Sequence, residues 1–234
     1  MTRPRAVIVD YGMGNLFSAR QAAERAGLDA VISAAREEVL AADAVVLPGM
    51  GAFGDAMAAL RELALVEALQ SVAVSGRPIM GVCLGMQLLM TRSFEFGEHE
   101  GLGLVPGEVR RLSQPLGMDG RRLKVPHVGW NRIHRPLSHG AVSGSSNRWI
   151  GTPLEELSDG EYMYFVHSYH VTPADSHHVL SVSRFGDVEF CSTLIEDNIF
   201  GTQFHPERSG PEGLKIYENF ARRIGSTLRR DGVA

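Results

Sequence analysis

Short apolar runs alternate with amphipathic stretches through the first half of the chain. Four of these runs have the length of a strand: residues 6–9, 30–32, 44–47 and 78–82. Residues 16–26, residues 55–74 and a segment that begins near Leu84 instead carry apolar side chains at helical spacing. Strands that alternate with helices predict an α/β fold, with a central, mostly parallel sheet flanked by helices.

The second half of the chain is richer in strand patterns. Six segments have them: residues 108–112, 121–125, 162–166, 179–184, 187–194 and 198–203. Turn residues at 119–120 and 186–187 indicate hairpins, so this part predicts an added antiparallel region. A last helix is predicted over residues 211–229. Because no linker composition, low-complexity run or repeat interrupts the chain, we expect residues 1–234 to form one domain.

Composition and charge narrow the classes of function. The formal net charge is −4, so no overall positive field favours nucleic acid. Two cysteines are too few for a secreted disulfide scaffold, and the polar first five residues do not resemble a signal peptide. No run reaches the roughly 18 apolar residues of a membrane span. We therefore expect a cytoplasmic protein that binds neither nucleic acid nor membrane.

A glycine-flanked cysteine stands where the fourth predicted strand meets a helix. Residues 81–87 read Gly-Val-Cys-Leu-Gly-Met-Gln, which places Cys83 on a tight turn at the carboxyl edge of the sheet. A helix N-terminus favours the thiolate, and its first N–H, that of Leu84, points where an oxyanion would form. This pattern predicts that Cys83 is a nucleophile. Cys191 lies within a strand pattern and is interpreted as a small buried hydrophobic residue.

Two further motifs predict the partners that a thiolate nucleophile needs. Residues 201–207 read Gly-Thr-Gln-Phe-His-Pro-Glu directly after a strand, so His205 is the candidate base and Glu207 is placed to orient its imidazole. Residues 48–51, Pro-Gly-Met-Gly, follow another predicted parallel strand. They would bring the N–H groups of Gly49 and Met50 beside Cys83 and complete an oxyanion hole with Leu84.

Neither a cofactor nor a metal is predicted. Gly12 and Gly14 suggest a dinucleotide fingerprint, but Phe17 occupies the place of its third glycine. No acidic residue ends the second predicted strand, where it would hold a ribose. The nine histidines show no metal-binding spacing with cysteines or carboxylates.

The three motifs together resemble those of the class I (triad) glutamine amidotransferases. Segments at residues 10–15, 97–103, 126–131 and 164–169 further resemble the glutaminase subunits of imidazole glycerol phosphate synthases. The similarity extends from the first strand to the last helix, in the order that the family shows. It implies a single-domain, flavodoxin-like class I glutamine amidotransferase fold.

The resemblance also implies an activity and a partner. Glutamine would be hydrolysed through a thioester on Cys83, with His205 and Glu207 completing a triad. Ammonia would pass to a (β/α)₈ synthase subunit, forming imidazole glycerol phosphate and the aminoimidazole ribotide of histidine biosynthesis. Gln87 lies one helical turn after Cys83 and is a candidate for holding the substrate. Positions that match the family's glutamine-binding residues are Gly51, Ser168 and Tyr169. Positions that match its partner-facing residues are Asn15, Trp130 and Tyr164.

Three alternative functions remain open at this point. Residues 208–215 resemble those of paralogues that supply ammonia to sugar-modifying synthetases. A stand-alone cysteine γ-glutamyl hydrolase would need no partner, whereas Trp130 and residues 11–15 are groups that a partner would cover. A regulatory binding module would have lost part of its active site, and here Cys83, His205 and Glu207 are all present.

Overall fold

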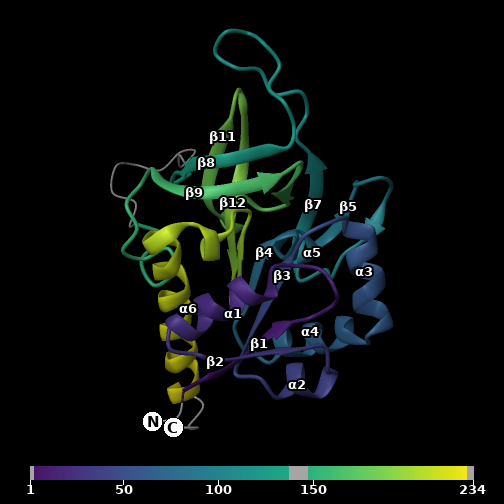
Figure 1. Ribbon diagram of the computed structural model, residues 1–234, viewed down its shortest axis with the longest axis vertical. Coiled ribbons are helices and arrows are strands. Elements are labelled where there is room, and N and C mark those ends of the chain that lie inside the picture. Colours follow the sequence, from purple (N-terminus) through teal and green to yellow (C-terminus); the bar gives the residue numbers. More distant parts are fainter. Residues whose placement is uncertain (1–2, 137–146, 231–234) are drawn as a thin grey trace.

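A seven-stranded sheet forms the centre of the structure, a computed structural model that describes residues 3–136 and 147–230 (Figure 1). Its strand order is β11-β12-β13-β4-β3-β1-β2. The five parallel strands are β1 (Arg5–Val9), β2 (Asp29–Ser33), β3 (Ala44–Gly49), β4 (Ile79–Cys83) and β13 (Ile199–Thr202). At one edge, β11 (Val179–Phe185) and β12 (Val188–Glu196) pair antiparallel. The predicted α/β class, with its added antiparallel region, is confirmed.

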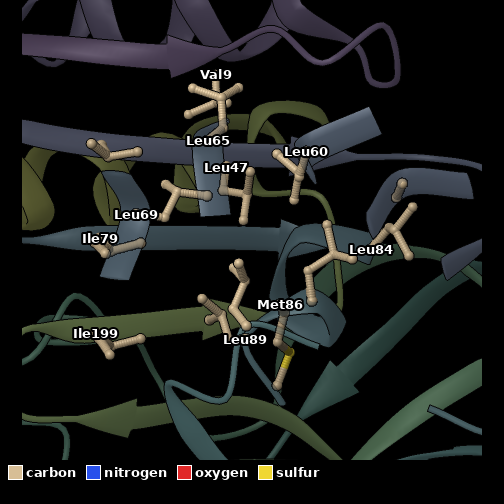
Figure 2. Close-up of a cluster of buried hydrophobic side chains, with 14 of the residues drawn as sticks. Val9, Leu47, Leu60, Leu65, Leu69, Ile79, Leu84, Met86, Leu89 and Ile199 are labelled. Atoms are coloured by element: carbon tan, nitrogen blue, oxygen red, sulfur yellow. The ribbon is translucent and has the colours of Figure 1, made fainter. Parts of the chain in front are cut away.

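Helices cover both faces of this sheet. The helices are α1 (Leu16–Arg25), α2 (Arg36–Ala41), α3 (Phe53–Glu62), α4 (Leu65–Val74), α5 (Leu84–Leu88) and α6 (Gly210–Arg230). Alternate residues of β1 and β3 belong to two separate cores, as the two-residue period of a strand requires. One core, shown in Figure 2, packs Val9 and Leu47 against α3 and α4. The other packs Ile8 and Val46 against α1 and α6.

Two smaller sheets extend the central one. The first contains β10 (Tyr169–Pro173), β7 (Val105–Arg111), β5 (Met90–Ser93) and β6 (His99–Glu100), in that order. The second is a hairpin of β8 (His127–Ile133) and β9 (Glu161–His167). Short 3₁₀ turns lie at Ser176–His178 (η1) and Pro206–Arg208 (η2). No helix of the described part of the chain is long and apolar enough to cross a membrane.

The helix predicted over residues 55–74 is wrong as a single element. It divides into α3 and α4 at Ala64, whose φ of 52° is left-handed. On one continuous helix, Leu60 and Leu65 would point about 140° apart. The break allows both side chains to be fully buried in the same core.

The strand predicted over residues 121–125 is also wrong. That segment forms only an isolated bridge between Leu116 and Arg122, and the strand that pairs with β9 is β8 instead. The elements α2, β5, β6, β8 and β10 were not predicted. The short strands among them are completed by pairing with distant segments, which a local pattern does not reveal.

Candidate active site

The candidate site lies where three neighbouring strands of the central sheet end. In the sheet β4 lies between β3 and β13, with Gly49 opposite Cys83 and Thr202 opposite Val82. The loop after β3 therefore runs along one side of Cys83, and the segment after β13 runs along the other. Both predicted motifs meet the cysteine because parallel strands present their carboxyl ends at the same edge.

Cys83 occupies a strained turn between β4 and α5. Its φ of 56° and ψ of −109° lie in a region that residues with a side chain rarely adopt. The flanking glycines make this turn possible. A Cβ at Gly85 would lie 1.7 Å from the Leu47 carbonyl oxygen, and one at Gly81 would lie 2.8 Å from the Gly85 backbone. With five residues, α5 has only a small dipole, so its free N–H groups are the main favourable contribution to a thiolate.

His205 is held beside this turn by its backbone and its side chain. The His205 N–H donates to the Tyr164 carbonyl at 2.9 Å, and the Ser209 hydroxyl donates to the His205 carbonyl at 2.7 Å. Imidazole Nδ1 lies 2.8 Å from Glu207 Oε1, and only 3% of the Glu207 side chain is exposed. This contact assigns the proton to Nδ1. It leaves Nε2, which has no other hydrogen-bond partner among the described residues, as the basic nitrogen.

The electrostatic surroundings of His205 favour its charged form. Burial by itself lowers the pKa of the imidazole, but the interactions with Cys83 and Glu207 outweigh it and raise that pKa. A raised imidazole pKa next to a cysteine is the condition for an imidazolium–thiolate pair. The arrangement is therefore suited to nucleophilic chemistry by sulfur.

A cavity of about 580 Å³ opens onto Cys83. Ten predicted site residues line it together: Asn15, Gly49, Met50, Gly51, Cys83, Leu84, Gln87, Ser168, Tyr169 and His205. The loop after β3 is fixed from behind, since the Tyr11 hydroxyl donates to the Pro48 carbonyl at 2.7 Å. Only glycine fits at position 49, where a Cβ would lie 2.4 Å from the Tyr11 hydroxyl oxygen and 2.9 Å from Leu84 Cβ.

Three of the predicted residues do not line the cavity. Glu207 lies behind His205. Trp130 and Tyr164 are opposite each other in the β8–β9 hairpin, with ring centroids 6.0 Å apart. Trp130 is 56% exposed, and the guanidinium of Arg208 lies 4.6 Å from the centre of the Tyr164 ring.

Glu95 is a lining residue that the sequence did not predict. It is buried, and its carboxylate accepts a hydrogen bond from the Phe53 N–H at 2.7 Å. Burial raises the pKa of this carboxyl, while the Phe53 N–H lowers it in part. The residue stands in an irregular segment between β5 and β6, beside Phe94 and Phe96. Local sequence gives no signal that such a carboxylate faces a cavity.

Gln203 was also missed, although it stands inside the predicted motif at residues 201–207. Its side chain is fully buried, and its amide nitrogen lies 3.7 Å from Cys83 Sγ. Its position two residues before the candidate base could have indicated from the sequence that it lies near Cys83. A residue at that distance along a strand end has the opportunity to contact the same neighbours as the base.

Comparison with known proteins identifies the family. The family model "Glutamine amidotransferase class-I" matches residues 7–224. The chain therefore belongs to the class I glutamine amidotransferase family.

Its relatives include proteins named imidazole glycerol phosphate synthase subunit HisH. The one from Geobacter sulfurreducens is 43% identical over 92% of this chain and 97% of its own length. The one from Aquifex aeolicus is 44% identical over 94% of this chain and 97% of its own. Both resemblances found in the sequence are confirmed.

Solved structures share the fold at lower identity. A structure of PurLQS from Thermotoga maritima superposes with a TM-score of 0.68 at 21% identity, covering 95% of this chain and 100% of the other. The glutaminase domain of Trypanosoma brucei CTPS, solved with bound acivicin, gives 0.63 at 19% identity, covering 95% of this chain and 94% of the other.

Proposed function

We propose that this chain is the glutaminase subunit of an imidazole glycerol phosphate synthase. It hydrolyses glutamine to glutamate and ammonia, and a (β/α)₈ partner uses the ammonia to form imidazole glycerol phosphate and the aminoimidazole carboxamide ribotide. The observation that carries the chemistry is the group of Cys83, His205 and Glu207 at one cavity, with Glu207 Oε1 2.8 Å from His205 Nδ1. The choice of acceptor reaction is supported by the names of relatives that match this chain over nearly their whole length.

The proposed reaction proceeds through a thioester. The Cys83 thiolate attacks the carboxamide carbon of glutamine, and the N–H groups of Leu84 and of the loop at Gly49 and Met50 stabilise the oxyanion. The C–N bond then breaks, and ammonia leaves with the proton of the His205 imidazolium. Water attacks the thioester carbon while His205 takes its proton, and cleavage of the C–S bond releases glutamate.

Charge complementarity supports glutamine as the substrate. The α-ammonium of an amino acid needs an acceptor, and the Glu95 carboxylate lies in the cavity wall, where it accepts a hydrogen bond from the Phe53 N–H. Gly51, Ser168 and Tyr169 line the same cavity and are proposed to bind the amino-acid end of glutamine. Gln87 is proposed to bind it from α5.

The β8–β9 hairpin is proposed to face the partner. Trp130, Val128 and Tyr162 expose apolar surface on it, at 56%, 57% and 47%. With Asn15 at the rim of the cavity and Tyr164 beside Trp130, they would form an interface around the exit for ammonia. We also propose that residues 1–234 act as one glutaminase domain, in a reducing cytoplasm that keeps the Cys83 thiol free.

The test is glutamate release by the chain alone, with a (β/α)₈ synthase partner, and with partner and acceptor. We expect low activity of the chain alone, because a glycine-flanked peptide in the loop at residues 48–51 can rest with its N–H turned away from the oxyanion, and one missing donor costs roughly 10²–10³ in rate. A large increase is expected in the ternary mixture, where the partner would bind the active orientation better. The Cys83→Ala variant is the control and should stay inactive in every mixture. Full activity of the chain alone would indicate a stand-alone γ-glutamyl hydrolase. Activation only by a sugar-modifying synthetase would indicate the paralogous reaction.

A further inference from the structure

Gln203 is the buried neighbour of the proposed nucleophile. It directly follows β13, and its backbone N–H donates to the Ser192 carbonyl at 2.9 Å. Its side chain is fully buried and does not line the cavity. Gln203 therefore does not touch glutamine and acts only on the residues that do.

A chain of hydrogen bonds fixes which way the Gln203 amide points. It begins at the Tyr169 carbonyl oxygen, which can only accept, and which receives the Gln87 Nε2–H at 2.9 Å. The same Gln87 nitrogen lies 3.2 Å from the Gln203 amide, so Gln203 must present Oε1 there. Its Nε2–H group is then left facing Cys83 Sγ at 3.7 Å. The sulfur is thus held as an acceptor.

The Gln203 N–H group offsets another contact of the Cys83 sulfur, which favours the protonated thiol. The Val166 carbonyl lies 3.8 Å from Sγ and favours the protonated thiol, because it can only accept a hydrogen bond. In the part of the chain that the structure describes, the titratable side chains that interact with Cys83 are His205, after β13, and Tyr11, after β1. Burial, and secondarily Cys83, raise the pKa of Tyr11, so that group is neutral. Among the described residues, Gln203 is the side chain that supplies a donor to the sulfur besides the His205 imidazolium.

We propose that Gln203 is a second stabiliser of the Cys83 thiolate, and that it also holds Gln87 with Oε1 facing the substrate. Both hydrogens of Gln87 Nε2 are used inside the protein, on Tyr169 and Gln203, so the oxygen is the end left for the cavity. That oxygen is an acceptor for the N–H groups of glutamine. The inference rests on the proposed glutaminase function and adds a residue that links the nucleophile to substrate binding.

The first test is the rate of alkylation of Cys83 by iodoacetamide as a function of pH, measured on the full chain in a Cys191→Ala background. Gln203→Glu keeps an acceptor for Gln87 but replaces the donor to sulfur by an anion. Gln203→Met removes both groups at similar volume. Losing a hydrogen bond to a charged group should slow alkylation at neutral pH by about 10-fold or more and move its midpoint upward by about one pH unit. Gln114→Glu, at an exposed loop position, adds the same charge and should change neither.

Steady-state kinetics with the partner separates the two roles. In Gln203→Glu, kcat should fall while the KM for glutamine changes little, since Gln87 stays held. In Gln203→Met, KM should rise as well. Circular dichroism and thermal unfolding establish that each variant is folded, and Gln203→Met serves alone if the buried charge unfolds Gln203→Glu. Unchanged alkylation profiles in folded variants would overturn the inference. Failure of the parent chain to react at Cys83 with a diazo-ketone analogue of glutamine would instead overturn the proposed function.

Discussion

The surroundings of the two cysteines differ far more than their burial does. Cys83 is 7% exposed and Cys191 is 6% exposed. Cys191 lies within β12, opposite Val182, and its thiol donates to the Thr193 carbonyl at 3.2 Å. Burial raises the pKa of that thiol, with the Thr193 contact as a minor opposing effect. Cys83 instead ends a strand, has a positive φ, and receives a donor from Gln203.

The comparison shows that burial alone does not determine what a thiol can do. A cysteine inside a paired strand has its backbone groups used by the sheet and finds only a carbonyl for its sulfur. A cysteine at a strand end meets free N–H groups, the loops of neighbouring strands and an open cavity. The position in the sheet, rather than solvent exposure, separates a reactive cysteine from a structural one.

The largest expected difference between the two cysteines is in catalysis. Cys83→Ala should reduce glutamine hydrolysis in the complex by roughly 10⁴- to 10⁶-fold, because the covalent route is lost. Cys191→Ala should stay within about twofold of the parent protein, since Cys191 does not line the cavity at Cys83. Glutamate release measures both. Comparable losses in the two variants would contradict the distinction.

The next effect separates the base from the residue that orients it. His205→Ala should approach the loss seen for Cys83→Ala. Glu207→Gln should cost about 10²- to 10⁴-fold, because the base remains while its orientation and charge stabilisation are disturbed. Both are measured as kcat/KM for glutamine with partner and acceptor present. A negligible loss at both positions would remove the triad from the mechanism.

The motifs around Cys83 could be predicted because each is continuous in sequence and each follows a strand. Once the strands are parallel, their carboxyl ends must lie at the same edge of the sheet, and the structure places Gly49 opposite Cys83 there. Glu95 and Gln203 could not be assigned in this way. Their roles depend on which group of a distant segment they face, such as the Phe53 N–H or the Gln87 amide.

The strands around Cys191, which are β11, β12 and β13, were predicted, but the β8–β9 hairpin was predicted only in part. The pattern at residues 121–125 has strand character but pairs with nothing beyond one bridge, while β8 was overlooked. In β8 the glycine and the polar Asn131 and Arg132 interrupt the apolar alternation. Pairing with β9 and the burial of His127 and Ile133 stabilise this strand, and the local sequence pattern does not predict either of them.

Backbone strain gives the two sites opposite expected responses to glycine. The Cys83→Gly variant should be more stable than the Cys83→Ala variant by about 1–2 kcal/mol, since glycine tolerates the positive φ at this position and relieves strain. The Cys191→Gly variant should be less stable than the Cys191→Ala variant by about 1 kcal/mol, because glycine in a strand costs chain entropy. Urea unfolding of the two Ala/Gly pairs measures this. The same sign at both positions would contradict a strained turn at Cys83.

Buried histidines extend the comparison to the pH dependence of stability. In the β8–β9 hairpin, His127 and His167 pack against Phe190, and their facing ring nitrogens are 3.1 Å apart. His167 also lines the cavity at Cys83. Burial is the main cause that lowers the pKa of His127 to about 4 and that of His167 to about 3. Beside Cys83, the pKa of His205 is raised. The contributions of the hairpin histidines and of His205 to stability should therefore be lost in opposite directions of pH.

The signs follow from proton binding. An unfolded histidine titrates near pH 6.5. Below that pH, His127 and His167 bind protons in the unfolded chain but stay neutral in the folded protein. Stability then falls on acidification, by up to about 1.4 kcal/mol per pH unit for each histidine. His205 binds its proton more tightly when folded, so its contribution is complete below about pH 6.5 and is lost as pH rises through its raised pKa. Urea unfolding of the parent protein, His127→Gln and His205→Gln across this range checks both signs. His127→Gln should flatten only the acid side and His205→Gln only the alkaline side, so a variant that flattens the opposite side would refute the sign assigned to that histidine.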